Sequence, residues 1–405
     1  MGIKAQDISY RFGVQSDRTT GAASLLDFAP LADDVPLAPS QDLVELNTDH
    51  GIVGEMYSDL AAQNRQEIAG KVPLYPTIAG TLFDAIFKRT SGGDLYYHTL
   101  ERWWKSALGG SFDKGERYYG CIFNKFGVTF ARNARNAEIV VDTGIFINAR
   151  RRILTAETAP TYDHSKGFPF GSSGVLLDFV HDASVDSYGA DDQDVRSVTL
   201  NFSNEVTLDG CVDNLSDAPL HRSWLVHAPG NPVMDVTVAV RINDHKYLNI
   251  SEYTVLPKGK LRVGCVHPKC TSITSTSTVT SATTSNQVLL VSSTTGFTVG
   301  DMVLITHPTT GFCVSKVTAI NAGVSLTISG YDTRVTLNGA SGGPLTIRNM
   351  AFGLTIDRMD FVSRGSTRRD GAFQVVELKY KVKLLAGSTF PLEWLSYDHA
   401  NLRIS

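Results

Sequence analysis

Cysteine is scarce in this chain, and so is charge. The 405 residues include only five cysteines, which are too scattered for a disulfide framework. Charged residues make up 19%, below the roughly 25% typical of globular proteins, and they nearly cancel to a net charge of -4. This balance argues against a protein whose whole surface grips nucleic acid, because such a surface would be strongly basic.

Long apolar runs are also missing. No uncharged stretch approaches the ~20 apolar residues that a membrane-spanning helix requires. The opening Met1-Gly-Ile-Lys lacks the apolar run of a secretory signal. We therefore expect no membrane partner and synthesis in the cytoplasm. The hydrophobic content of 42% is nevertheless enough to bury a core, which excludes a wholly disordered chain.

Helical patterns are rare. The best one spans Asp94–Gly109, where apolar residues from Tyr97 to Leu108 recur at three- and four-residue steps. Asp94 can cap the free N–H groups at its start, and Gly109 can end it. A weaker helical pattern lies within Val53–Glu67. We predict a helix at each place.

Most of the remaining sequence predicts strands. Several segments are rich in β-branched residues or alternate apolar and polar residues, as strands with one buried face do. The clearest are Ala137–Asn148, Val198–Phe202, Met234–Asn243, Phe352–Val362 and Phe373–Leu384. The predicted fold class is therefore mainly β, with one or two short helices.

Two long strand pairs share one design, a hairpin with an arginine-bearing tip. In the first, Ile122–Phe130 and Ala137–Ile147 flank the tip. In the second, Leu354–Val362 and Ala372–Leu384 flank it. The tip arginines are Arg132 and Arg135 in the first hairpin, and Arg364, Arg368 and Arg369 in the second. The identity between the pairs is slight, so the pattern suggests two related domains without demonstrating a duplication.

A block of different composition separates the two hairpins. Thr271–Asn286 contains twelve Ser or Thr in sixteen residues, which indicates an exposed linker. Short strands and tight turns follow, and they predict a small barrel-like module inserted in the second domain. The predicted boundaries are an N-terminal arm at 1–40, a first β domain at 41–190, a second at 191–270 and 349–405, and the linker with its module at 271–348.

No motif assembles a catalytic, cofactor or metal site. Cys265, His267 and Cys270 place three possible metal ligands within six residues, but a structural zinc site needs a fourth. The alternative is a reduced cysteine pair at a strand end. Ser341 fits the G-x-S-x-G pattern of serine hydrolases, yet Pro344 follows where that motif requires a helix. A glycine-rich turn is the favoured interpretation.

Other polar and aromatic clusters are equally weak signals. The carboxylates of Asp191–Asp194 lack the spacing of a calcium loop. His164 and the pair His181-Asp182 are interpreted as surface polar residues. Trp103 and Trp104, near Tyr96 and Tyr97, could stack on a sugar, although at least one tryptophan is expected in the core. We therefore predict no enzyme and no cofactor.

Several features together resemble the tail tube proteins of long-tailed, siphovirus-like bacteriophages. They are an extended lead at Ala69–Val72, the predicted helix Leu95–Leu108 that closes in Leu-Gly-Gly, and Tyr119-Gly-Cys121 opening a long hairpin. In the second domain, Val198–Val206 and Phe352–Leu384 resemble the family's sheet strands. The Ser/Thr-rich linker and the Cys265–Cys270 cluster depart from the family pattern.

The resemblance implies tandem β-sandwich or barrel domains and a structural role. Copies would stack as rings into the hollow tail tube, through which viral DNA passes without specific binding. Two such domains in one chain imply three subunits in each ring, with approximate six-fold symmetry. The resemblance also implies tape measure and terminator proteins as partners, assembly in the host cytoplasm, a place in the virion tail, and arginine tips that contact neighbouring subunits. Alternatives are a capsid decoration or baseplate protein, a carbohydrate-binding surface protein, and a hydrolase that uses Ser341 or the acidic loop Asp191–Asp194.

Overall fold

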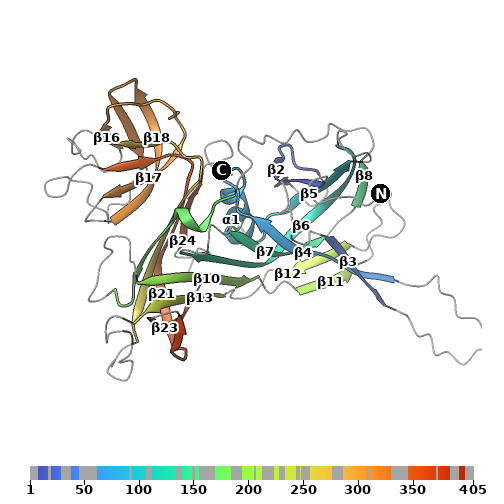
Figure 1. Ribbon diagram of the computed structural model, residues 1–405. Coiled ribbons are helices and arrows are strands. Elements are labelled where there is room, and N and C mark those ends of the chain that lie inside the picture. The colour runs from blue at the N-terminus through green and yellow to red at the C-terminus, as the bar shows by residue number, and fades with distance from the viewer. Residues whose placement is uncertain are drawn as a thin grey trace, which may run out of the picture.

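Strands dominate the computed structural model of the chain (Figure 1). The structure describes residues 8–16, 20–28, 38–44, 62–90, 94–105, 112–132, 139–147, 151–154, 169–183, 194–204, 207–211, 223–227, 233–242, 247, 256–275, 286–307, 311–329, 345–370, 373–383 and 392–396. Within these ranges there is one α-helix, α1 (Ala79–Phe87), and one short 3-10 helix, Ser172–Gly174. The predicted mainly β fold class is confirmed.

The strands follow one another closely along the chain. Those before residue 190 are β1 (Ile8–Val14), β2 (Leu26–Phe28), β3 (Ala38–Val44), β4 (Ala62–Pro73), β5 (His98–Lys105), β6 (Phe112–Ala131), β7 (Val140–Ile147), β8 (Arg151–Leu154) and β9 (Val175–Val180). Those from there to residue 270 are β10 (Val195–Ser203), β11 (Thr207–Cys211), β12 (Ser223–His227), β13 (Val233–Arg241) and β14 (Lys258–Val266). The last are β15 (Ser272–Thr274), β16 (Asn286–Leu290), β17 (Met302–His307), β18 (Gly311–Asn321), β19 (Ser325–Ser329), β20 (Thr346–Arg348), β21 (Ala351–Arg364), β22 (Arg368–Asp370), β23 (Phe373–Lys383) and β24 (Leu392–Ser396).

One large antiparallel sheet carries most of these strands. Its main path runs β2-β1-β5-β6-β10-β13-β23-β21-β14-β9, and β3, β4, β7, β8, β22 and β24 attach beside that path. The path crosses the predicted domain boundary at residues 190 and 191, because β6 pairs with β10 and β9 pairs with β14. The two predicted domains therefore share one sheet. That they are related to each other stays a prediction.

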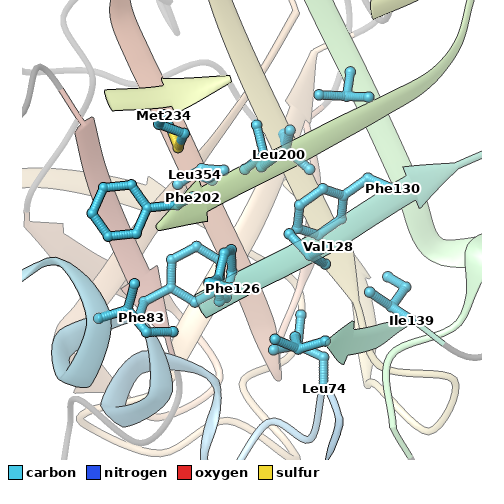
Figure 2. Close-up of a cluster of buried hydrophobic side chains, with 14 of the residues drawn as sticks. Leu74, Phe83, Phe126, Val128, Phe130, Ile139, Leu200, Phe202, Met234 and Leu354 are labelled. Atoms are coloured by element: carbon cyan, nitrogen blue, oxygen red, sulfur yellow. The ribbon is translucent and has the colours of Figure 1, made fainter. Parts of the chain in front are cut away.

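The sheet curls around a single apolar core, shown in part in Figure 2. The Phe83 ring of α1 packs edge-on against Phe126 of β6, with ring centroids 5.0 Å apart, and against Phe352 of β21 at 5.1 Å. Phe130 of β6 stacks on Phe352 at 6.2 Å. Since β6 and β21 are not neighbours in the sheet, these contacts join two separate parts of it across the core. Burial of each such ring contributes about 2 to 3 kcal/mol.

Residues alternate between the core and a polar surface along β6, β10, β13 and β23. One buried row in register is Val128, Leu200, Val236 and Tyr380. The adjacent rows point the other way and consist of Thr129, Thr199, Thr237 and Lys379, and of Gly127, Asn201, Asp235 and Lys381. We call these eight residues the polar face. They are half-buried or exposed, as the two-residue period of a strand requires when one side is solvated.

The first predicted hairpin is confirmed, and the second is confirmed where the end of β21 pairs with β23. In the first, β6 pairs with β7 from Cys121 and Ile147 to Val128 and Val141. In the second, β23 pairs with the end of β21 and with β22, which folds back along it. β23 also pairs with β13 along its length, so the second hairpin continues the sheet formed by β10 and β13.

The predicted helix at Asp94–Gly109 is wrong over its central residues. His98–Lys105 form strand β5, held between β1 and β6. Leu100 and Trp103 are both buried although they lie on opposite faces of the strand, because both faces are covered. The weaker helix within Val53–Glu67 is also wrong where it is described, since residues 62–67 belong to β4. Residues 53–61 lie outside the described residues.

The inserted segment forms a second sheet with its own core. Its strand order is β15-β20-β17-β18-β19-β16, and a bridge between Ser275 and Val291 joins the two outer strands into a closed barrel. The predicted short strands of this module are confirmed. In Figure 1 the module is the orange unit that stands at one end of the molecule. Part of the predicted linker, Ser272–Thr274, is strand β15, and residues 276–285 lie outside the described ranges.

The module docks on the large sheet at a pair of glycines. Gly264 of β14 and Gly353 of β21 lie opposite each other in register, and we call them the glycine seat. A Cβ on Gly353 would lie 2.6 Å from Cβ of Val314, and one on Gly264 would lie 2.8 Å from Cδ1 of Leu304. Both distances are shorter than any ordinary contact, so only glycine admits the module this closely.

Polar contacts hold the same joint. Arg262 of β14 donates from Nη1 to the carbonyl oxygen of Phe312 in the module, over 2.5 Å. Oδ1 of Asn349 accepts the backbone N–H of Thr271 (2.7 Å), and its Nδ2 donates to the carbonyl of Gly296 (2.7 Å). The entry to the module at Thr271 and its exit at Asn349 are thus hydrogen-bonded to each other, and Asn349 is also bound to the turn at Gly296.

Candidate functional site

The tip of the β21–β23 hairpin is exposed and carries three arginines. Arg364 ends β21, while Arg368 and Arg369 lie on β22. All three side chains are exposed. Arg368 forms an ion pair with Glu377 of β23, with a nitrogen–oxygen distance of 3.2 Å, and the N–H of Gly365 donates to the Glu377 carbonyl at 2.7 Å. The tip is therefore fixed against β23.

An exposed aromatic side chain lies beside these arginines. Phe373 is 43% exposed, and the guanidinium carbon of Arg241 on β13 lies 3.5 Å from its ring centroid. The guanidinium carbon of Arg196 on β10 lies 5.6 Å from the same centroid. Each such contact is worth about 0.5 to 1 kcal/mol at an exposed site. Val362, 47% exposed, lies at an irregularity in the β21–β23 register. The surface is therefore both cationic and apolar.

The first hairpin tip lies at the same end of the sheet. Arg132 follows β6, and its backbone N–H donates to the carbonyl of Arg196 over 2.9 Å. Its side chain is half-buried and donates from Nη2 to the carbonyl of Leu177 on β9, also over 2.9 Å. This bond ties the tip to the chain's own edge strand. Arg135 lies outside the described residues.

Six arginines thus gather where β6, β10, β13, β21 and β22 end side by side. We call this set the arginine end; it comprises Arg132, Arg196, Arg241, Arg364, Arg368 and Arg369. The sequence pointed to four of them through the hairpin tips. It missed Arg196 and Arg241, because only the strand order brings these residues beside Phe373. A role of the tips in subunit contacts stays a prediction.

A buried charged cluster lies elsewhere in the sheet. Arg11, Glu101 and Arg117 are opposite one another on β1, β5 and β6. Glu101 is fully buried; its Oε1 accepts from Nε of Arg117 over 2.6 Å, and its Oε2 lies 3.8 Å from Nη1 of Arg11. The indole N–H of Trp103 donates to Oε2 over 2.8 Å. These bonds satisfy the carboxylate, so the cluster is structural and offers no open acid or base.

The same bonds weaken the carbohydrate-binding interpretation. Trp103 is only 2% exposed and its indole N–H is already bound. Its ring therefore cannot stack on a sugar. Trp104 is half-buried with the guanidinium carbon of Arg102 6.0 Å from its ring. The expectation that at least one tryptophan belongs to the core is confirmed.

The cysteine and histidine cluster does not form a metal site. Cys265 lies in the main core and burial raises the pKa of its thiol; burial also raises that of half-buried Cys270. The Nδ1 of His267 accepts the N–H of Lys269 over 3.2 Å. In the described ranges, no three His, Cys, Asp or Glu side chains are grouped to hold a metal ion.

The other polar candidates do not meet either. His181 was expected at the surface, but it is 2% exposed and its Nδ1 hydrogen-bonds the hydroxyl of Tyr380, so that prediction is wrong. Asp194 contributes its backbone carbonyl to the N–H of Arg241 at 2.8 Å. His164 and Ser341 lie outside the described residues. These candidates are therefore not brought together among the residues that the structure describes.

His98 makes the stability of the fold sensitive to acid. It is enclosed by Phe12 and Phe123, with ring centroids 5.9 and 5.3 Å away, and burial lowers its pKa to about 4 from 6.5. Above pH 6.5 both folded and unfolded chains hold it neutral. Below pH 6.5, His98 is protonated in the unfolded chain but stays neutral in the folded chain, so the free energy of unfolding falls until the pH reaches about 4.

We therefore expect wild-type protein to lose about 2 to 3 kcal/mol more stability between pH 7.5 and pH 4.5 than a His98→Leu variant does. Urea unfolding of both proteins at each pH measures this difference. For each protein, the loss is taken relative to its own free energy of unfolding at pH 7.5, which removes the effect of the substitution on stability at that pH. Equal losses in the two proteins would contradict a buried, neutral His98.

In the described ranges, α1 has nine residues, and no helix has the length and apolarity needed to cross a bilayer. The arginine end combines exposed arginines with exposed apolar side chains, and we take it as the candidate functional surface. The sequence matches no protein-family model, and no curated protein is significantly similar to it.

Proposed function

We propose that this chain is a self-assembling structural protein that stacks as rings into the hollow tail tube of a long-tailed bacteriophage. One observation carries the proposal: a continuous antiparallel sheet has a polar face on one side and open edges. Among the described strands, β2, β3 and β24 each pair with a single neighbour. Such edges present unpaired N–H and C=O groups, and joining copies edge to edge satisfies them.

The polar face suits the wall of a channel. Its threonines are neutral, and its charged residues are Lys379, Lys381 and Asp235, which leave a net charge of only +1. A strongly basic wall would hold phosphates through counterion release and slow DNA passage. We propose that this face lines the lumen and that viral DNA passes it without specific binding.

The proposed ring contains three copies with approximate six-fold symmetry, since each chain would supply two related domains. Head-to-tail contacts close into a ring when the rotation between copies divides a full turn. In the virion tail the tube would contact the tape measure and terminator proteins, after assembly in the host cytoplasm. The chain would carry no catalytic activity.

Electron microscopy of the purified full chain tests the proposal. We expect tubes of uniform bore, whose averaged cross-section shows three-fold symmetry with six similar lobes. Isolated rings that never stack would favour a capsid decoration or baseplate protein. A monomer that stays monodisperse at high concentration would overturn self-assembly altogether. Sedimentation velocity over a concentration series, with urea-unfolded protein as the control, separates these outcomes.

A further inference from the structure

The arginine end carries a net positive charge. Its six arginines are accompanied by three carboxylates, those of Asp194, Asp370 and Glu377. The Glu377 carboxylate is paired with Arg368. Neither Arg196 nor Arg241 forms an ion pair with any residue that the structure describes. The positive charge of this surface is therefore only partly offset by the described chain.

Charges in the middle of the same sheet are arranged differently. Lys258 of β14 lies opposite Asp360 of β21, and Asp360 lies opposite Lys381 of β23. Lys381 in turn lies opposite Asp235 of β13. Residues directly opposite each other on neighbouring strands have Cβ atoms about 5 Å apart, so both lysines lie close to a carboxylate. An anion is therefore attracted more strongly to the arginine end than to this row.

An aromatic ring lies between two of the arginines and the solvent. The guanidinium carbon of Arg241 is 3.5 Å from the ring centroid of Phe373, and that of Arg196 is 5.6 Å from it. At 3.5 Å the Arg241 guanidinium is in contact with the ring. Its N–H groups lie in the plane of the guanidinium, so they can still donate to oxygens beside the ring. The ring itself is 43% exposed and can stack on another flat group.

This composition favours nucleic acid over an acidic protein as the partner. A protein interface buries about 800 Å² on each side around an apolar centre. Among the described residues, the exposed large apolar side chain beside Arg196 and Arg241 is Phe373. Val362 lies next to Lys379 in the β21–β23 register, about 20 Å along β23 from Phe373. Interfaces with nucleic acid are more polar and more positively charged, as this surface is.

We propose that the arginine end binds single-stranded nucleic acid, with guanidinium groups on the phosphates and a base stacked on Phe373. Proteins that hold single strands combine cationic side chains along the backbone with aromatic rings under the bases. Such binding is independent of base sequence, because every nucleotide has a phosphate and a flat base. The surface occupies one end of the sheet, in agreement with the net charge of -4 of the whole chain. The inference goes beyond the proposed self-assembly and does not depend on it.

Fluorescence anisotropy of a labelled (dT)20 strand tests the binding, with the full chain and a series of NaCl concentrations from 50 mM. Arg196→Gln with Arg241→Gln should weaken binding about tenfold or more. The slope of log affinity against log salt should become shallower by about 1.4, since each phosphate contact to a single strand contributes about 0.7. Lys258→Gln with Lys381→Gln is the matched control. It removes the same charge beside carboxylates, so its affinity should stay within about threefold of wild type.

A second variant separates stacking from charge. Phe373→Leu keeps an apolar side chain but removes the ring, so it should weaken (dT)20 binding about fivefold or more while the salt slope stays unchanged. Circular dichroism and thermal melting establish that each variant is folded. Should the Arg196 and Arg241 changes disturb folding, Arg364→Gln with Arg369→Gln replaces them. Both of these side chains are exposed, and their loss should weaken binding as well.

Each outcome decides for or against the proposal. No binding of (dT)20 by wild-type protein at 50 mM NaCl would overturn it, and so would arginine variants that bind as tightly as the lysine control. We expect polyglutamate to displace labelled (dT)20 less well than unlabelled (dT)20 does at equal charge. Equal displacement would reject nucleic acid as the preferred partner and indicate an acidic protein. Sedimentation velocity records the assembly state of every sample, so a failure of binding is distinguished from a failure of the proposed self-assembly.

Discussion

Glu101→Ala is expected to lower the free energy of unfolding by about 3 kcal/mol. The fully buried carboxylate is the shared partner of Arg117, Arg11 and the indole of Trp103. Its removal leaves two guanidinium groups facing each other, with side chains only 21% and 20% exposed. Water reaches them too poorly to replace the lost charge.

Urea unfolding followed by tryptophan fluorescence measures this loss, because Trp103 lies in the cluster. Arg368→Ala is the matched control: its ion pair with Glu377 is exposed and should contribute less than about 1 kcal/mol. A Glu101→Leu, Arg117→Leu double variant should lose less than the sum of its single variants, since it leaves fewer unpaired charges. A loss below about 1 kcal/mol for Glu101→Ala would show that the cluster does not hold the three strands together.

Gly353→Ala should cost about 2 kcal/mol, and Gly353→Val more, because both overpack the joint between sheet and module. The added Cβ would lie 2.6 Å from Cβ of Val314, an atom that cannot rotate away. The module must shift as a unit to relieve this contact, and a shift would break the bond from Arg262 to Phe312.

Gly365→Ala is the control for the glycine seat. Its Cβ would meet Glu377 at 3.4 Å, an ordinary contact, so stability should change by less than about 0.5 kcal/mol. Urea unfolding gives both values, and limited proteolysis should cut the Gly353→Val variant faster near the joint. If Gly353→Ala behaves like Gly365→Ala, the module is not held by close packing.

The strands were predictable from sequence where one face is buried and the other is not. β10 and β13 alternate visibly, as does β23. The sequence of β5 predicted a helix because Leu100, Trp103 and Thr99 are all buried, and burial on two faces erases the two-residue period of a strand. The three- and four-residue spacing that remained imitates a helix.

The true helix was missed for a related reason. α1 is buried along its whole length, so no polar face reveals its period, and Ile78 at its start offers no side-chain cap. A short apolar run of this kind cannot be told from a buried strand by pattern alone. The arginine end shows the same limit at longer range, since Arg196 and Arg241 join it only through the order of strands.

One consequence follows from where the module leaves the main sheet. β14 and β21 pair in register up to Val266 and Ala351, the last residues before and first residues after the inserted part. In the large sheet, the whole inserted part therefore occupies the position of the loop in a β-hairpin formed by β14 and β21. A different segment inserted between Val266 and Ala351 would leave the pairing of β14 with β21 intact. Its side chains would have to fill the space above Gly264 and Gly353, which have no side chains.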